Sequence, residues 1–191
     1  MTIAILAVQG AFAEHGAMLD RLGAAHFEIR QAADLARPFD GLILPGGEST
    51  VMNKLLRELD LFSPLKEKID GGLPVFGTCA GLILLADRVE GGERCFGGMD
   101  ITARRNAYGR QLGSFRTQEP FAGKSVPMVF IRAPYIAQAG PEVEILAETG
   151  GHIVAARQGN RLAAAFHPEL TEDTTVHAYF LKMAGMVNFP T

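Results

Sequence analysis

The stretch Leu73-Pro-Val-Phe-Gly-Thr-Cys-Ala-Gly81 decides the fold, because a short apolar strand runs straight into a glycine-flanked turn. An apolar helix starts directly afterwards, at Leu82. The same order of strand, turn and helix occurs earlier in the chain, where the apolar run at residues 3–8 ends at Gln9-Gly10. Continuous apolar runs of strand length are typical of strands that are buried on both faces of a parallel sheet.

The rest of the chain extends this pattern. Helical periodicity predicts helices at 13–22, 50–59, 63–69, from Leu82 and at 175–187, whereas apolar runs predict strands at 3–8, 26–30, 41–44 and 73–76. Closely spaced strands follow at 98–103, 126–131, 143–147, 152–158 and 161–166, the last two joined by a hairpin at Gly159-Asn160. We therefore expect an α/β fold with an open, mixed but mainly parallel sheet flanked by helices, as in flavodoxin-like proteins.

Composition limits the function classes. The 191 residues show no internal repeat or linker and predict a single domain over residues 1–191. Lys and Arg number 18 and Asp and Glu 21, so the net charge of 18 − 21 = −3 argues against nucleic-acid and anionic-lipid partners. Apolar runs are far shorter than the roughly 20 residues that span a bilayer, and the first charge is Glu14, so we expect no membrane segment, no signal peptide and a cytoplasmic location.

The segment Gly77-Thr-Cys-Ala-Gly81 lies between a predicted strand and a predicted helix, which is where a nucleophile elbow forms. Such a turn strains the backbone at Cys79, and the glycines leave room around it. The start of the helix favours the thiolate form of the cysteine. The alternative is that Cys79 is a small buried apolar residue, as free cysteines often are.

The segment Phe166-His-Pro-Glu169 makes catalysis the better interpretation. In an extended backbone, residues two apart point to the same side, and we expect Pro168 to keep this segment extended. Glu169 then accepts the N–H of the His167 ring and fixes its tautomer, which leaves the other ring nitrogen to face a nucleophile. Taken alone, His167 at a strand end and a solvated Glu169 would be unremarkable, but together with the elbow they predict a Cys–His–Glu triad.

The turn Pro45-Gly-Gly-Glu-Ser49 follows the strand at 41–44, and we expect Ser49 or Thr50 to cap the helix after it. A glycine-rich turn at this edge can aim a backbone N–H at a developing oxyanion, and the Ala80 N–H is its natural companion. A phosphate loop is the other interpretation, but the spacing and the lysine of such loops are missing.

The remaining histidines, His15, His26, His152 and His177, lack metal-ligand spacing, so each is interpreted as a surface or packing residue and no metal is expected. Cys95 has no elbow around it.

These motifs resemble the signature of class I triad glutamine amidotransferases. Further segments are similar to the glutaminase subunits of pyridoxal 5′-phosphate synthases, and the resemblance extends from residue 3 to about residue 187. The segments are Leu6-Ala-Val-Gln-Gly10, Glu14-His15, Leu44-Pro-Gly-Gly-Glu-Ser-Thr50, Arg105-Asn-Ala-Tyr-Gly-Arg-Gln111, Phe130-Ile-Arg-Ala-Pro134 and Phe166-His-Pro-Glu-Leu-Thr-Glu-Asp173. Arg116, where the family usually has an acidic residue, and the glycine-rich stretch 88–98 depart from the family pattern.

The resemblance implies the class I glutamine amidotransferase fold and a subunit that hydrolyses L-glutamine and delivers ammonia to a separate (β/α)8-barrel synthase. It implies that Cys79, His167 and Glu169 are the triad. The implied glutamine-binding residues are Gly47, Glu48, Ser49, Arg105, Ile131 and Arg132. Gln9 matches a residue that organises the oxyanion site with Gly47 and Ala80, and either arginine suits the α-carboxylate of the substrate. No metal or organic cofactor is implied for this chain.

Two alternatives remain open at this point. One is another enzyme, either an amidotransferase subunit of a different synthase or a free-standing γ-glutamyl hydrolase. The other is a flavodoxin-like binding or scaffold protein in which Cys79 is a redox-sensitive thiol.

Overall fold

The structure is a computed structural model, which describes residues 1–105 and 114–186. Its strands are β1 (Thr2–Leu6), β2 (Ala25–Ile29), β3 (Gly41–Leu44), β4 (Val75–Thr78), β5 (Ala86–Glu90), β6 (Met99–Arg104), β7 (Ser114–Phe121), β8 (Lys124–Ile131), β9 (Tyr135–Ala139), β10 (Glu144–Thr149), β11 (His152–Gln158) and β12 (Arg161–Ala164). Its α-helices are α1 (Phe12–Arg21), α2 (Ser49–Glu58), α3 (Phe62–Asp70), α4 (Ala80–Leu85) and α5 (Thr175–Met183), with short 3-10 helices η1 (Ala32–Ala36) and η2 (Pro168–Leu170).

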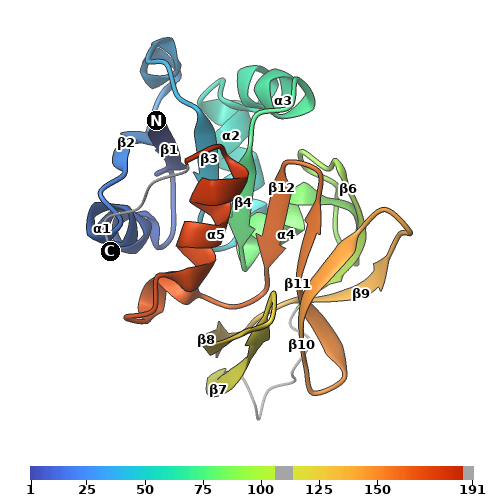
Figure 1. Cartoon of the computed structure of the whole chain (residues 1–191). Coiled ribbons are helices and arrows are strands. Elements are labelled where there is room, and N and C mark those ends of the chain that lie inside the picture. The colour runs from blue at the N-terminus through green and yellow to red at the C-terminus, as the bar shows by residue number, and fades with distance from the viewer. Residues whose placement is uncertain (106–113, 187–191) are drawn as a thin grey trace.

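A ten-stranded sheet forms the centre of the molecule, in the order β2-β1-β3-β4-β12-β11-β9-β6-β5, with β10 paired to β11 (Figure 1). The strands from β2 to β12 in this order run parallel. All residues of β3 and β4 are buried, because helices cover both faces of the parallel part. This burial explains why these strands are continuous apolar runs in the sequence.

Helices cover the two faces of the parallel part (Figure 1). Helices α1 and α5 lie on one face, and α5 packs there through the contact between Phe180 and Phe76 of β4, whose ring centroids are 5.6 Å apart. Helices α2, α3 and α4 lie on the other face, where α4 contacts β3, β4 and β12. The predicted α/β fold, with a mixed and mainly parallel sheet flanked by helices, is therefore confirmed.

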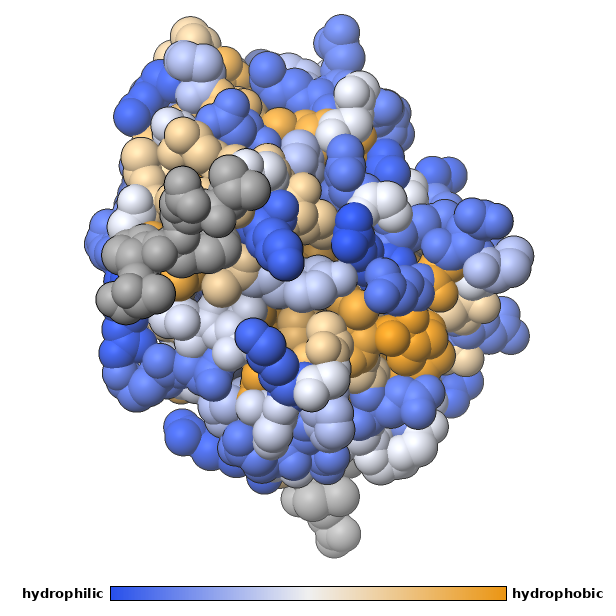
Figure 2. Space-filling model, viewed as in Figure 1, coloured by the Kyte–Doolittle hydropathy of each residue, from blue (hydrophilic) through white to orange (hydrophobic). Residues whose placement is uncertain are grey.

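The second half of the sheet is largely antiparallel. Strands β11 and β12 pair around the predicted two-residue turn at Gly159-Asn160, and β9 pairs antiparallel with both β11 and β6. Strands β7 and β8 form a separate two-stranded sheet. On the face in Figure 2 the surface is mostly hydrophilic, with an apolar patch over the antiparallel half of the sheet.

The sequence did not predict β5, β7 and β9. In β7 the partly buried positions are Phe115, Thr117 and Glu119, so polar side chains hide the alternation of a half-buried strand. Strand β5 follows the last residue of α4 without any turn residue between them, and β9 has only five residues. The stretch after β2, for which no helix or strand was predicted, forms η1. The last helix ends at Met183, and residue 187 of the predicted range lies outside the described residues.

The parallel register brings several loops to one edge of the sheet. Leu44 is paired with Gly77, and Thr78 with Ala164. The segments that follow β3, β4 and β12 therefore leave the sheet at the same level, as does the segment after β1. No helix in the described parts of the chain is long and apolar enough to cross a membrane.

Gly81 in α4 provides a test of this packing. A Cβ at residue 81 would lie 2.1 Å from the carbonyl oxygen of Leu44, so backbone would have to move. Helix propensity alone favours alanine over glycine by about 1 kcal/mol. We nevertheless expect Gly81→Ala to lower the free energy of unfolding by about 1–3 kcal/mol, measured by urea denaturation.

Gly16→Ala in α1 is the matched control, since a Cβ there meets only the His26 ring, at 3.0 Å. Its stability should change by less than about 1 kcal/mol. Equal stability of the two variants would contradict the packing described for α4 and β3.

Candidate active site

Cys79 occupies a sharp turn between β4 and α4. Its φ of 49° and ψ of −100° are the strained values expected of a nucleophile elbow. A Cβ at Gly77 would lie 2.5 Å from the backbone of Gly81, so the turn closes only because residue 77 is glycine. The N–H of Cys79 donates to the carbonyl of Ala164 at 2.8 Å, which ties the turn to the end of β12. The elbow predicted from the sequence is present.

His167 and Glu169 meet as predicted. Nδ1 of His167 lies 2.7 Å from Oε1 of Glu169, and both side chains are buried. The N–H of His167 donates to the carbonyl of Val129 at 2.8 Å, so β8 also helps to place the ring. The Glu169 contact leaves Nε2 of His167 free to act on the cysteine.

The backbone of this segment corrects one expectation. Pro168 does not keep it extended but begins the 3-10 helix η2, while His167 itself remains non-helical with φ −108° and ψ 85°. Proline suits the first turn of a helix because its fixed φ is already helical and its missing N–H is not needed there. The tight turn still brings the two side chains together.

The pKa of His167 depends on both Cys79 and Glu169. Burial disfavours its charged form, but hydrogen bonds to Cys79 and Glu169 outweigh burial and raise the pKa of His167 to about 10. The imidazolium form is therefore stabilised between a sulfur and a carboxylate. The structure thus brings together the three side chains of the predicted triad, with His167 in the middle.

The glycine turn after β3 lies directly against this group. A Cβ at Gly46 would lie 2.3 Å from Cε1 of His167 and 3.3 Å from the Cβ of Cys79. The carbonyl of Gly46 accepts from the N–H of Ala11 at 3.2 Å, and the N–H of Glu48 donates to Oε1 of Gln9 at 2.8 Å. The segment that follows β1 thus holds the turn on both sides of Gly47.

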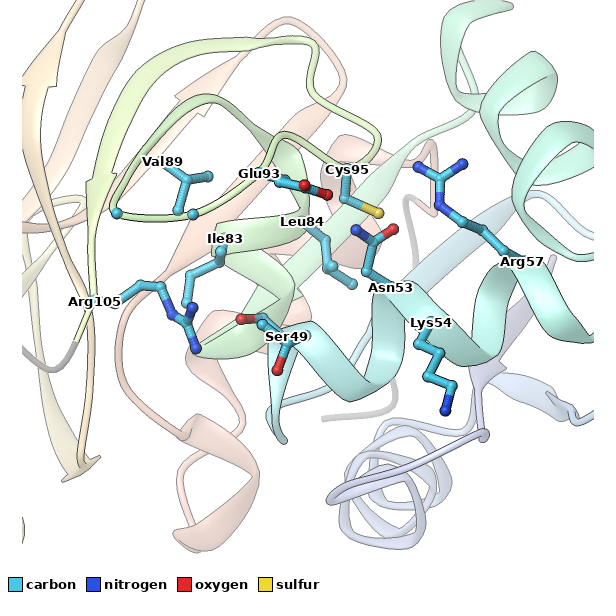
Figure 3. Close-up of a pocket in the computed structure, with 13 residues that line it drawn as sticks. Ser49, Asn53, Lys54, Arg57, Ile83, Leu84, Val89, Glu93, Cys95 and Arg105 are labelled. Carbon is cyan, nitrogen blue, oxygen red and sulfur yellow. The ribbon is translucent and has the colours of Figure 1, made fainter.

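Glu48, rather than Ser49 or Thr50, is the N-cap of α2. Its extended backbone and long side chain let Oε1 accept from the N–H of Thr50 at 3.3 Å, which corrects the predicted cap. The same oxygen lies 3.1 Å from Nη2 of Arg105. Ser49 and Arg105 line a pocket of about 430 Å³, and Figure 3 shows the Arg105 side chain directed toward the start of α2.

The lining of that pocket includes neither Ile131 nor Arg132, nor any member of the predicted triad. Ile131 ends β8 with 37% of its surface exposed, and Arg132 follows with a left-handed φ of 43°. Residues 106–111 of the motif that begins at Arg105 lie outside the described residues.

The sequence did not reveal the contacts of His15 with His177 and Thr78. His15, interpreted as a surface or packing residue, is fully buried, and its ring contacts both Thr78 and His177. One signal was available, since His15 shares the apolar face of its helix with Met18 and Leu19. Nε2 of His26, by contrast, lies within hydrogen-bonding distance of exposed Asp20, at 3.0 Å.

Cys95 is not part of the predicted triad, although it lines the pocket beside Ser49 and Arg105 (Figure 3). Both cysteines are free and buried. Burial raises the pKa of the Cys95 thiol to about 11, so that thiol stays protonated at neutral pH. In the described residues, no group of three or more His, Cys, Asp or Glu is placed to hold a metal ion.

Known proteins are similar to this chain over nearly its whole length. The chain is 60% identical to "Pyridoxal 5'-phosphate synthase subunit PdxT" of Methanocorpusculum labreanum, over 98% of this chain and 100% of the relative. A protein of the same name from Desulfitobacterium hafniense is 53% identical, over 100% of this chain and 97% of the relative.

Two solved structures are also similar to this chain. A "glutamine amidotransferase" crystal structure matches with a TM-score of 0.90 and 42% identity, over 96% of this chain and 99% of the other. A structure of PurLQS from Thermotoga maritima, 11% identical over 96% of this chain and 94% of the other, shares the fold with a TM-score of 0.63.

The family resemblance inferred from the motifs is confirmed by these relatives, and residues 5–186 match the model of one family. The chain belongs to the SNO glutamine amidotransferase family.

Proposed function

We propose that Cys79, His167 and Glu169 are the catalytic triad with which this chain hydrolyses L-glutamine to glutamate and ammonia, as the glutaminase subunit of a pyridoxal 5′-phosphate synthase. The observation that carries the proposal is the placement of His167, whose Nδ1 lies 2.7 Å from Glu169 and whose raised pKa has both Cys79 and Glu169 among its causes. Membership of a glutamine amidotransferase family supports the substrate, and the name of the relatives supports the role as a synthase component.

In the first step, the Cys79 thiolate attacks the side-chain amide carbon of glutamine, and the developing oxyanion accepts from the N–H groups of Gly47 and Ala80. His167, as the imidazolium, gives its proton to the amide nitrogen. The C–N bond breaks, ammonia leaves, and a γ-glutamyl thioester remains on Cys79. Glu169 holds the ring and stabilises its charged form while this happens.

In the second step, neutral His167 takes a proton from water, which attacks the thioester carbon. The C–S bond breaks, glutamate leaves, and the thiolate and imidazolium are restored. The raised pKa of His167 fits this cycle, because one of its causes is the sulfur atom itself. Formation of the thioester removes the charge on the sulfur, so the ring is then more easily kept neutral as a base.

Residues of the glycine turn after β3, Arg105 after β6 and the end of β8 have a role in holding the amino-acid end of glutamine. Arg105 or Arg132 pairs with the α-carboxylate, since a guanidinium fork fits a carboxylate. Gly47, Glu48, Ser49 and Ile131 complete the substrate site. The contact of Arg105 with Glu48 supports this assignment, because it places the cation beside the turn that carries the oxyanion donor.

The ammonia product implies a partner. Free ammonia in neutral water is mostly protonated and no longer nucleophilic, so a synthase that uses it benefits from a closed path between the two sites. We propose that the partner synthase is a separate (β/α)8 barrel and that the complex works in the cytoplasm, where reducing conditions keep Cys79 a thiol.

The first test concerns the nucleophile. We expect Cys79→Ala to abolish glutamine hydrolysis, a loss of at least about 10³-fold, while the fold and partner binding persist, because only the sulfur is removed. The measurement is ammonia release from glutamine by the purified complex.

Cys95→Ala is the matched control, since it removes the other buried cysteine. It should retain the activity of the wild-type chain. Ammonia release that persists in Cys79→Ala would refute the assigned nucleophile.

The roles within the triad give a second test. We expect Glu169→Gln to reduce kcat less than His167→Asn, since an orienting group can be replaced in part but the proton carrier cannot. Steady-state kinetics of the two variants provide the comparison. If both lose the same activity, the roles assigned to the two residues are wrong.

Regulation by the partner gives a third test. Both neighbours of Gly47 are held from the segment after β1, through Ala11 to Gly46 and through Gln9 to Glu48. A synthase that shifts this segment on docking would reorient the oxyanion donor. We expect ammonia release to be low for the isolated chain, to rise when the synthase is added, and to rise less in Gln9→Ala. Comparable rates with and without the synthase would favour a free-standing γ-glutamyl hydrolase.

A further inference from the structure

A chain of buried polar groups lies behind Glu169, on the face of β4 opposite to Cys79. Nδ1 of His15 is 2.8 Å from Nε2 of His177, and Nε2 of His15 is 3.1 Å from Oγ1 of Thr78. Nε2 of His15 is also 3.6 Å from Oε2 of Glu169. Oε1 of Glu169 contacts His167, so the two carboxylate oxygens face two different imidazole rings.

These buried polar side chains are enclosed by aromatic rings. The Phe76 ring meets His15 and His177 edge to face, with centroids 6.1 Å and 5.6 Å apart, and Phe180 packs on the same phenylalanine. Burial lowers the pKa of His15 well below its ordinary value, with further lowering by His177 and His167. Burial also lowers the pKa of His177 to about 3. Both rings are therefore neutral at physiological pH, and each carries a single N–H.

The contacts select one tautomer of each ring. If Nδ1 of His15 carried the proton, its Nε2 lone pair would face the carboxylate of Glu169, which can only accept. Nδ1 of His177 would then carry a proton as well, although it has no hydrogen-bond partner among the described residues. A buried donor without a partner is rarer and costlier than an acceptor without one.

The favourable arrangement has the proton on Nε2 of both rings. His177 then donates to Nδ1 of His15, and His15 directs its own N–H at Thr78 and Glu169. Oε2 of Glu169 has no hydrogen-bond partner among the described residues, and a 3.6 Å separation from His15 is an electrostatic contact rather than a hydrogen bond. The nearest N–H to that oxygen in this network is therefore the one on His15.

We propose that His15 is a positioning residue of the glutaminase site, whose Nε2–H holds the Glu169 carboxylate in the orientation that presents Oε1 to His167, while His177 fixes the tautomer of His15. The inference rests on the proposed triad. His15 is fully buried and its charged contact is Glu169, so it acts on the reaction through that carboxylate and not by touching substrate. The titratable groups that face it are His177 on α5 and Glu169 and His167 at η2, and Thr78 is its polar contact on β4.

The test compares His15→Gln with His15→Asn. The amide nitrogen of glutamine reaches about as far as Nε2 of histidine, so it can direct an N–H at Glu169, whereas that of asparagine reaches only the position of Nδ1 and faces His177. We expect His15→Asn to lower kcat about 10- to 100-fold with little change in KM, because a misplaced catalytic group costs rate rather than substrate binding. His15→Gln should restore most of the lost rate.

The pKa of His167 is the second readout, measured by NMR titration of its ring in the full chain. The bond to Glu169 is one of the causes that raise this pKa. It should therefore fall in His15→Asn and remain near the wild-type value in His15→Gln. A merely structural role for His15 would not separate the two amides in this way.

Leu19→Ala is the control for lost packing, since Leu19 is buried on the same face of α1 without a polar contact. It should lower stability yet leave kcat of the folded protein and the pKa of His167 unchanged. Equal kcat and equal His167 pKa in the Gln and Asn variants would overturn the proposal. Hydrolysis that survives Cys79→Ala would overturn the triad itself, and the NMR titration reports on His15 in either case.

Discussion

The active site depends on how closely backbone segments approach one another at the carboxyl edge of the parallel strands. A Cβ at Gly10 would lie 1.8 Å from the carbonyl oxygen of Gly46, and one at Gly81 would lie 2.1 Å from that of Leu44. These distances are shorter than any real contact of a Cβ atom. No side chain fits at these two positions, so the backbone segments pack directly against one another at this edge. The close approach brings the loops after β1, β3 and β4 within reach of a single substrate. It also holds Cys79 in its strained conformation.

The same crowding explains how much of the site is visible in the sequence. Glycines at fixed positions around Cys79 report the elbow directly, because the turn tolerates no other residue there. His167 and Glu169 lie two residues apart, so their pairing is a local property that survived the wrong expectation for the backbone at Pro168. The parallel strands were found for a similar reason, since burial on both faces leaves an uninterrupted apolar run.

Features that depend on distant parts of the chain were less accessible. The contact of His15 with His177 joins residues 162 positions apart, and nothing in either helix identifies the other as its partner. Strand β7 was missed because the side chains that it buries include Thr117 and Glu119 rather than apolar residues alone. The cap at Glu48 was assigned to its neighbours because short polar residues are the usual caps, and the long carboxylate is bound here by Arg105 as well.

Strand β4 also determines which side chains lie on either side of the sheet at this point. Because side chains alternate along a strand, Phe76 and Thr78 face the two buried histidines, while Cys79 at its end turns toward the opposite side. The end of this strand therefore lies between the proposed nucleophile and a fully buried pair of histidines. The Glu169 carboxylate lies between the two, so one of its oxygens faces the fully buried His15 while the other contacts His167 of the proposed triad.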